Sequence, residues 1–341
     1  MKKIVVTGGM GFIGAHTVVS LLEQQYEVII LDNLVNARLE TLTGIEAITA
    51  KRPAYYNIDM CDASKLDAFF KEQGDVEAVI HFAALKAVGE SVEKPLLYYH
   101  NNMVGLINLL MSMQKYEVSK LVFSSSATVY GEPDSLPITE ENTTKPAMSP
   151  YGNTKKIAED IIRDLTNADK KFNAISLRYF NPIGAHASAN IGELPNGIPN
   201  NLMPYITQTA IGLRKELMVF GGDYNTPDGT AVRDYIHVVD LADAHVKTLE
   251  RMFVGKQKNN YEVFNLGTGK GSTVLEVIKS FERTTGEKIP YKIVGRRDGD
   301  AESTYAATDL ANKELNWNAQ YNLDDMTKSA WNWERAVRKI K

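Results

Sequence analysis

Short apolar runs alternate with amphipathic stretches through the first half of the chain. Runs of Val, Ile, Leu and Ala with few polar residues predict buried strands at 4–6, 28–31, 76–80, 121–123 and 174–177. Apolar residues recur at helical spacing in 14–24, 63–73 and 95–114. Strands that are apolar on both faces are typical of a parallel sheet covered by helices on both sides. The pattern therefore predicts an α/β fold with a doubly wound parallel sheet.

The amino-acid composition of the chain changes after residue 180. Residues 182–235 are rich in Gly, Pro and Asn, which indicates loops over a smaller lobe. Two later helices are predicted at 238–251 and 274–284. We expect a first domain over residues 1–180 and a smaller mixed α/β lobe over residues 181–341, with the chain crossing between them more than once.

Composition narrows the classes of partner. Lys and Arg total 38 against 42 for Asp and Glu, a formal net charge of −4, which argues against a protein that wraps nucleic acid. With Cys61 as the only cysteine, neither an intrachain disulfide nor a cysteine-based metal cluster can form. The start of the chain lacks the features of a secretory signal, and no apolar run is long enough to span a bilayer. We expect a cytoplasmic protein with no metal, membrane or nucleic-acid partner.

A glycine-rich turn follows the first predicted strand and opens the first helix. It reads Thr7-Gly8-Gly9-Met10-Gly11-Phe12-Ile13-Gly14. Gly8, Gly11 and Gly14 suit a tight turn, a close approach to a pyrophosphate, and close packing of helix on strand. The start of the helix then offers free N–H groups and a positive dipole end to the phosphates.

Asp32 stands at the end of the second strand, about 20 residues beyond the glycine turn, as in the dinucleotide-binding fingerprint. Its carboxylate can accept hydrogen bonds from both ribose hydroxyls of NAD and would repel the 2′-phosphate of NADP. The sequence therefore predicts a Rossmann-type domain that binds NAD. Asp59, just after the third β-like run, is a predicted adenine contact.

Two segments carry the predicted chemistry. The fifth strand ends in the hydroxyl-rich run 124–126, at the carboxyl edge where open α/β sheets bind ligands. The segment 149–155 then opens a helix, with Ser149 as N-cap and Pro150 in the first turn. Tyr151 and Lys155 are four residues apart and so share one helical face.

Tyr151 is the predicted acid–base residue. A free tyrosine, with a pKa of about 10, is a poor base at neutral pH. A neighbouring ammonium from Lys155 and a positive nicotinamide both favour the phenolate, so we predict a lowered pKa for Tyr151. The pair can then accept the proton of an alcohol undergoing oxidation, with Ser126 hydrogen-bonded to the reacting oxygen.

This arrangement resembles the extended short-chain dehydrogenase/reductase family over essentially the whole chain. Further strings are similar to those of the UDP-galactose 4-epimerase family: His81-Phe82-Ala83-Ala84-Leu85-Lys86-Ala87-Val88-Gly89-Glu90-Ser91, Arg178-Tyr179-Phe180-Asn181-Pro182, Asn200-Asn201-Leu202-Met203-Pro204, Arg233-Asp234-Tyr235-Ile236-His237 and Arg296-Arg297-Asp298-Gly299-Asp300.

The resemblance implies roles for individual residues. Lys86 and Asn101 match positions near the nicotinamide. The remaining residues expected around NAD are Phe12, Ile13, Asn33, Asn36, Met60, Phe82, Ala83, Ser124, Tyr179 and Phe180.

For the substrate, the resemblance assigns Asn181 and Asn201, with the adjoining Leu202, to phosphate or sugar contacts, and Asp300 to the uridine ribose. Met218, Val219 and Phe220 form the expected uracil strand. Arg233 and Arg297 can clamp the diphosphate through charge-assisted forks.

The activity that the resemblance implies is inversion at C4 of a UDP-hexose. Tyr151 takes the proton of the C4 hydroxyl while the C4 hydride passes to NAD, giving a 4-keto sugar and transient NADH. The ketone turns about its diphosphate linkage, and hydride and proton return on the other face. The family also implies a homodimer formed through two helices, here at 98–114 and after Tyr151.

Two positions depart from the family pattern. Ala84 stands where a glycine is often found. Thr304 stands where some members carry a bulky tyrosine, and members that accept N-acetylhexosamines carry a small residue. We therefore expect UDP-N-acetylglucosamine and UDP-N-acetylgalactosamine as additional substrates beside UDP-glucose and UDP-galactose.

The sequence bears on three alternative functions. A sugar-nucleotide 4,6-dehydratase would need an acidic pair after the strand-end hydroxyl, where this chain has Ala127-Thr128-Val129. An NAD-binding sensor without catalysis would tolerate loss of Tyr151 or Lys155, and both are present. A UDP-pentose or UDP-uronate C4 epimerase stays open, because sugar-pocket residues are hard to read from sequence.

Overall fold

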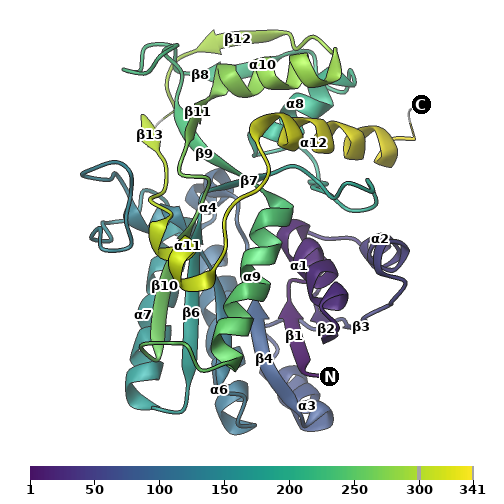
Figure 1. Ribbon diagram of the computed structural model, residues 1–341, viewed down its shortest axis with the longest axis vertical. Coiled ribbons are helices and arrows are strands. Elements are labelled where there is room, and N and C mark those ends of the chain that lie inside the picture. Colours follow the sequence, from purple (N-terminus) through teal and green to yellow (C-terminus); the bar gives the residue numbers. More distant parts are fainter. Residues whose placement is uncertain (298–300, 340–341) are drawn as a thin grey trace. The chain divides into compact units, whose positions relative to one another are not determined.

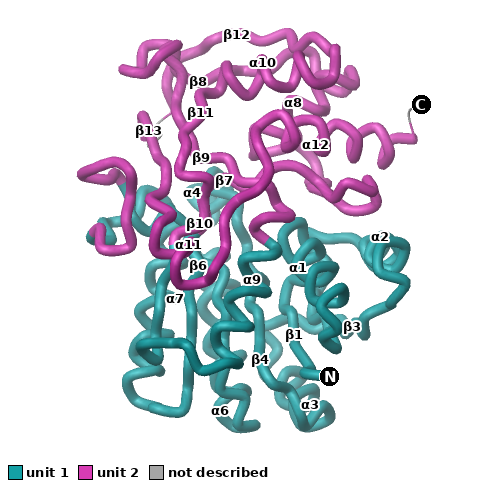
Figure 2. Tube along the Cα trace, in the orientation of Figure 1, with its two compact units in different colours: residues 1–131, 143–178, 242–264 teal, residues 132–142, 179–241, 265–341 magenta. Residues whose placement is uncertain are grey.

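The computed structural model describes residues 1–297 and 301–339. They form two compact units, each assembled from segments that are distant in the sequence (Figure 2). Unit 1 consists of residues 1–131, 143–178 and 242–264, and unit 2 consists of residues 132–142, 179–241 and 265–341. The chain therefore passes between the two units several times.

Unit 1 is built on a seven-stranded sheet in the order β10-β6-β5-β4-β1-β2-β3 (Figure 1). The strands are β1 (Lys3–Thr7), β2 (Glu27–Leu31), β3 (Ala54–Tyr56), β4 (Val76–His81), β5 (Lys120–Ser126), β6 (Asn173–Tyr179) and β10 (Tyr261–Leu266). The pairs β1–β2, β1–β4, β2–β3 and β4–β5 are parallel. The strand order reverses between β1 and β4, the topological switch point of a doubly wound sheet. The predicted strands and the predicted Rossmann-type fold are confirmed.

Helices cover both faces of this sheet. Side chains of α3, α6 and α7 form one apolar core with alternate residues of the strands, while α1 and α9 lie on the opposite face (Figure 1). The helices are α1 (Phe12–Glu23), α2 (Glu40–Thr49), α3 (Ala63–Gln73), α4 (Val88–Glu93), α5 (Pro95–Tyr99), α6 (Gly105–Lys115), α7 (Pro150–Ala168) and α9 (Val238–Phe253), with a 3-10 turn η2 (Ala127–Tyr130) after β5. Among the described residues, no helix is both long and apolar enough to cross a membrane.

The single helix predicted at 95–114 is interrupted. A π-helical turn, η1 (His100–Val104), separates α5 from α6. Within this turn, Asn102 donates to the carbonyl of Leu85 at 3.0 Å and to Thr154 Oγ1 at 3.0 Å. The apolar pattern alone did not predict this interruption; π-turns are frequent at functional sites.

Unit 2 contains a mixed sheet centred on β9 (Val232–His237). This strand pairs antiparallel with β11 (Gly271–Thr273) and parallel with β13 (Ser303–Thr304) and β7 (Asn181–Ile183). A second, two-stranded parallel sheet joins β8 (Leu217–Phe220) to β12 (Tyr291–Val294). Apolar side chains of α8 (Leu202–Ala210), α10 (Val274–Thr285) and α12 (Leu323–Val337) form the core with β8 and β9, and α11 (Asp309–Leu315) precedes α12. The predicted later helices and the mixed α/β character are confirmed.

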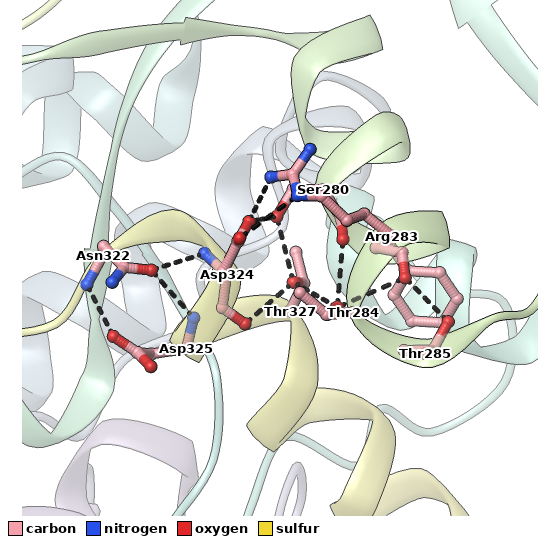
Figure 3. A network of polar contacts seen from close by, with 9 residues as sticks. Ser280, Arg283, Thr284, Thr285, Asn322, Asp324, Asp325 and Thr327 are labelled. Carbon is pink, nitrogen blue, oxygen red and sulfur yellow. Dashed lines mark hydrogen bonds and ion pairs between the residues drawn. The ribbon is translucent and has the colours of Figure 1, made fainter.

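The last helix, α12, is fixed at its start by a polar network (Figure 3). Asn322 accepts the backbone N–H groups of Asp324 at 2.8 Å and Asp325 at 3.1 Å, and Asp325 accepts the N–H of Asn322 at 3.0 Å. Asp324 also accepts the Ser280 hydroxyl of α10 at 2.6 Å and pairs with Arg283. The network caps α12 and ties it to α10 within unit 2.

Candidate active site

The glycine turn lies between β1 and α1 and has room only for glycine. Gly8 has a positive φ of 69°, and a Cβ added there would lie 2.7 Å from the backbone nitrogen of Ala83. A Cβ on Gly14 would lie 2.2 Å from the carbonyl oxygen of Gly8. Gly11 is the N-cap of α1 and offers no side chain to the N–H groups of the first turn, which starts at Phe12 and Ile13. These N–H groups and the bare backbone suit a pyrophosphate.

Asp32 is buried at the end of β2, beside the glycine turn. Its carboxylate accepts the N–H of Met10 at 3.1 Å and the N–H of Leu34 at 2.8 Å, and burial raises its pKa. Two hydrogen bonds leave acceptor capacity for ribose hydroxyls. The structure also brings Asn33 and Asp59 together, because Asn33 Nδ2 donates to Asp59 Oδ2 at 3.1 Å. These residues fit the adenosine half of NAD.

The segment after β4 runs next to the same turn. The N–H of Phe82 donates to the carbonyl of Thr7 at 3.0 Å, and the N–H of Ala83 to Thr7 Oγ1 at 3.3 Å. Further along, Lys86 is exposed. The remaining predicted cofactor residues of unit 1 are distributed as follows: Asn36 is exposed in the loop after β2, Met60 is buried beside α6, and Asn101 lies in the π-turn, where it donates to Asn102 at 2.9 Å.

The hydroxyl-rich run 124–126 and the segment 149–155, which opens α7, meet at the carboxyl end of β5. Ser149 caps α7 by accepting the N–H of Gly152 at 3.2 Å, and Pro150 occupies the first turn, as predicted. The ammonium of Lys155 is buried and donates to the carbonyl oxygen of Ser124 at 2.6 Å.

The Tyr151 hydroxyl lies near Ser126, whose hydroxyl acts to lower the pKa of Tyr151. Ser126 Oγ also accepts the N–H and the hydroxyl of Thr128 at 3.2 and 3.0 Å. The predicted acid–base residue therefore lies at the carboxyl end of β5, near the strand-end hydroxyl.

The predicted lowering of the Tyr151 pKa is wrong for the protein groups alone. Desolvation raises the pKa of Tyr151 to about 12, and the opposing hydrogen bond from Ser126 is the smaller effect. Lys155 does not reverse this, because burial lowers its own pKa to about 8 and its ammonium is directed to the Ser124 carbonyl. Buried beside it, His81 is kept neutral: burial and the nearby ammonium lower its pKa to about 3.

Substrate-site predictions fall on the sheets of unit 2. In the mixed sheet, Thr304 of β13 is the register partner of Arg233 of β9, and Asn181 of β7 is the register partner of Tyr235. The Arg233 guanidinium donates to the carbonyl of Val232 at 2.7 Å. The arginine expected at the diphosphate and the threonine expected at the sugar are thus neighbours on adjacent strands.

The expected uracil strand is β8. Its burial alternates: Val219 faces the core, whereas Met218 and Phe220 are partly exposed. The Arg297 guanidinium stacks over the Phe220 ring, 4.3 Å from its centroid. The other predicted residues of unit 2 are placed as follows: Asn201 is the N-cap of α8 and donates to Glu193 at 2.6 Å, Leu202 starts α8, Tyr179 and Phe180 are buried, and Asp300 lies outside the described residues.

One buried residue without a predicted role organises this region. Asp234, next to Arg233, accepts the N–H and hydroxyl of Thr268 at 2.8 and 2.6 Å, the N–H of Gly269 at 3.0 Å and the N–H of Ala306 at 3.1 Å. It therefore holds β9, the turn before β11 and the segment after β13 together. Asp234 belongs to the string 233–237 that resembles the family, but nothing in that string distinguishes a structural carboxylate from one that binds a ligand.

Comparisons with known proteins show the family of the chain. A family model described as GDP-mannose 4,6 dehydratase matches residues 5–330. The chain is 52% identical over 336 residues to UDP-glucose 4-epimerase 1 of Oryza sativa subsp. japonica, covering 98% of this chain and 94% of that protein. The chain belongs to the UDP-glucose 4-epimerase family. Its likeness to the extended short-chain dehydrogenase/reductases is thereby confirmed.

Solved structures of the UDP-glucose 4-epimerase family share the fold over the full length. The crystal structure from Stenotrophomonas maltophila, with bound NAD and formylated UDP-arabinopyranose, has a TM-score of 0.96 at 47% identity, covering 100% of both chains. The crystal structure from Bifidobacterium longum, in complex with NAD+ and UDP, has a TM-score of 0.95 at 48% identity, also covering 100% of both chains. In this chain the turn after Ser126 is Ala127-Thr128-Val129, so it lacks the carboxylates that a dehydratase would need there.

Proposed function

We propose that this protein is an isomerase, an NAD-dependent UDP-glucose 4-epimerase that interconverts UDP-galactose and UDP-glucose through a 4-keto intermediate. The observation that carries the proposal is that α7 places Tyr151 near Ser126 and the buried Lys155 on the Ser124 carbonyl, both at the carboxyl end of β5 in a doubly wound sheet. The close relatives are UDP-glucose 4-epimerases over nearly the whole chain.

The cofactor belongs to unit 1. Gly8, Gly11 and the start of α1 take the pyrophosphate, and Asp32 takes the adenosine ribose, for the reasons of space and acceptor capacity given above. When bound, NAD+ supplies a positively charged ring that accepts hydride from C4, returns it to C4, and favours the Tyr151 phenolate.

The proton is handled by residues of β5 and α7. Tyr151 accepts the proton of the C4 hydroxyl as that carbon is oxidised, and donates it back when the ketone is reduced. Ser126 holds the reacting oxygen in line with the phenol. Lys155, while charged, stabilises the phenolate that proton return leaves behind. Both the proton and the hydride are returned to the sugar, on the opposite face of C4, so the net change is inversion at C4.

The UDP part of the substrate belongs to unit 2. Arg233 and Arg297 neutralise the diphosphate, and Met218 and Phe220 flank the uracil. Binding energy from these non-reacting groups anchors the nucleotide while the hexose stays free to turn, so that either face of C4 can be presented.

Thr304 widens the proposed substrate range. Its side chain is shorter than the tyrosine that some family members carry at this position, and it lies next to Arg233 on the adjacent strand. We therefore include UDP-N-acetylglucosamine and UDP-N-acetylgalactosamine. A UDP-pentose is the second candidate class, because the Stenotrophomonas relative was crystallised with a formylated UDP-arabinopyranose.

One NMR experiment tests the activity and the range. Purified protein is given UDP-galactose or, separately, UDP-N-acetylgalactosamine, without added NAD. We expect both to equilibrate with their C4 epimers, and Thr304→Tyr to lose conversion of the acetylated pair by at least about tenfold while retaining the other, as one steric clash of roughly 1–3 kcal/mol implies. Conversion of neither sugar would contradict the epimerase; an unchanged range in Thr304→Tyr would contradict the role of Thr304.

We also propose a homodimer formed through α5, α6 and α7. Apolar side chains gather on the outer surfaces of α5 and α6: Leu96 is 81% exposed, Leu97 47%, Ile107 41% and Met111 64%. A cluster of exposed large apolar side chains on neighbouring helices marks a protein–protein contact. α5 packs on α7 through, among other contacts, a hydrogen bond from Asn153 to the Tyr99 hydroxyl at 2.7 Å.

A further inference from the structure

A buried ion pair joins α7 to β6 within unit 1. The side chains of Glu159 and Arg178 are 3% and 7% exposed. Arg178 Nε lies 2.9 Å from Glu159 Oε1, and Nη2 lies 2.5 Å from Oε2, so the contact is bidentate. Removing two charges from water costs about as much as their attraction returns, so such a pair is weak evidence for stability. Its position suggests a different role.

Hydrogen bonds connect this pair to the end of β5. Ser125 Oγ donates to Glu159 Oε1 at 2.5 Å. Arg178 Nη1 donates to the Tyr130 hydroxyl at 2.9 Å, and its guanidinium lies 4.8 Å from the centroid of the Tyr130 ring. Ser125 and Tyr130 belong to the strand end and to η2, the 3-10 turn that follows it. The ion pair is therefore hydrogen-bonded to the segment 124–130 at two residues, Ser125 and Tyr130.

That segment carries the catalytic contacts. Ser124 offers the carbonyl that accepts the Lys155 ammonium, and Ser126 offers the hydroxyl that meets Tyr151; the serine held by Glu159 lies between them. On α7, Tyr151, Lys155 and Glu159 follow one another at intervals of four residues, which places them along one stripe of the helix. The three residues of this stripe thus lie at Ser124, Ser125 and Ser126, three consecutive residues of β5.

From this geometry we infer that Glu159 and Arg178 are positioning residues for proton transfer: they hold the 124–126 strand end in register with the catalytic stripe of α7. The inference rests on the proposed epimerase function. The alignment of Tyr151 with Ser126, the pair proposed to handle the proton, depends on this register.

The pair also shapes the electrostatic surroundings of Lys155. The charged and titratable groups there are Tyr151 and Glu159 on α7, His81 on β4, and Arg178 behind the carboxylate on β6. The Glu159 carboxylate raises the pKa of Lys155 against the larger effect of burial. Loss of the carboxylate with Arg178 left in place would expose Lys155 to an uncompensated positive charge.

A second buried ion pair in unit 1 provides a matched control. Arg251 of α9 and Glu262 of β10 are 5% and 8% exposed and 2.8 Å apart. Both pairs are bidentate and comparably buried. The test compares two double variants. One carries Glu159→Met together with Arg178→Met, and the control carries Glu262→Met together with Arg251→Met. For each folded variant, kcat, KM for UDP-galactose and the Kd of UDP are measured.

The inference predicts a separation of kcat from binding. Misalignment of reacting groups by about 1 Å can cost about 100-fold in rate, so we expect kcat of the Glu159/Arg178 double variant to fall about 10- to 100-fold. KM and the Kd of UDP should stay within about threefold, as should kcat of the control double variant. A folded Glu159/Arg178 variant with wild-type kcat, or a control that loses as much, would overturn the inference.

Two further variants keep the test decisive if the double variant does not fold. Ser125→Ala removes only the tie to the strand end, and we expect kcat to fall about tenfold, since one buried hydrogen bond of about 1.4 kcal/mol is lost. Glu159→Gln leaves Arg178 uncompensated, and the alkaline limb of its kcat profile should move down by about one pH unit. A wild-type kcat in Ser125→Ala together with an unshifted alkaline limb in Glu159→Gln would overturn the inference.

The outcome also separates this inference from the proposed function. If the wild-type protein converts no UDP-sugar, the epimerase proposal fails. The effect of Glu159→Gln on Lys155 is then read from unfolding against pH, where the Lys155-linked gain in stability should begin at lower pH than in the wild type. No difference in that onset would overturn the inference without reference to activity.

Discussion

At the scale of single residues, desolvation is the dominant influence on the catalytic groups. Burial raises the pKa of Tyr151 to about 12 and lowers that of Lys155 to about 8. Each shift favours the neutral form of its group, as transfer out of water must. Burial therefore favours a neutral phenol at Tyr151 and lowers the pKa of the neighbouring Lys155 ammonium; in the proposed mechanism, the positive charge of NAD+ would favour the phenolate.

Stability should depend on pH through Lys155. The unfolded lysine has a pKa near 10.5 and the folded one about 8, so between these values the unfolded state binds more protons and stability increases with pH. The increase approaches about 1.4 kcal/mol per pH unit within that window. Unfolding by urea at pH 7.5, 8.5 and 9.5 should show the increase in the wild type and its loss in Lys155→Met.

The exposed Lys65, with 63% of its side chain accessible, serves as the control for that measurement. Lys65→Met should follow the wild-type pH dependence. Identical curves for Lys155→Met and the wild type would contradict a lowered pKa at Lys155.

At the scale of secondary-structure elements, the residues of the proposed sites lie mostly at the ends of strands and the starts of helices. In unit 1, β1, β2 and β5 each end in a residue or turn with a proposed cofactor or catalytic role. In unit 2, Asp234 joins β9 to the segments around β11 and β13 through four hydrogen bonds. Burial raises the pKa of Asp234, and the hydrogen bonds from Thr268, Ala306 and Gly269 oppose that effect.

Asp234→Asn should therefore destabilise the protein. The amide group that replaces one carboxylate oxygen would face backbone N–H donors, a mismatch of about 1–3 kcal/mol. Because Arg233 and Thr304 are carried by the strands that Asp234 joins, KM for UDP-galactose should also rise. Urea unfolding and steady-state kinetics measure the two effects, with Asp223→Asn as an exposed control, 74% accessible. Equal stability in Asp234→Asn and the wild type would rule out this structural role.

Much of this architecture was predictable from sequence. Apolar runs gave the strands, and the glycine turn with Asp32 gave the dinucleotide site, because both depend on local residue chemistry. The contacts of Glu159 with Ser125 and Arg178 join residues far apart in sequence, so no local pattern contains them. For the protein groups alone, the direction of the Tyr151 pKa shift was not predicted, because the sequence reveals a neighbouring charge but not the depth of burial.

At the scale of the whole molecule, the chain combines two units with separate proposed roles, NAD in unit 1 and the UDP-sugar in unit 2 (Figure 2). The assembly proposed above adds a second copy across α5 and α6. If it forms, light scattering should give twice the chain mass of 37.9 kDa. Leu96→Glu with Met111→Glu should return the single-chain mass, since charges are poorly tolerated in an apolar interface.

The matched control for assembly is Leu213→Glu, a charge placed on a 58% exposed leucine of unit 2. This variant should keep the wild-type mass. A wild-type protein that elutes with the single-chain mass would contradict the proposed dimer.

The central claim is that the same hydrogen leaves C4 and returns to it. UDP-galactose carrying deuterium at C4 is incubated in ordinary water with the purified protein and no added cofactor, and the product is examined by NMR. We predict UDP-glucose that retains deuterium at C4, with conversion reduced at least about 100-fold in Tyr151→Phe because its acid–base group is missing. Loss of the deuterium to solvent, or no UDP-glucose at all, would contradict the account.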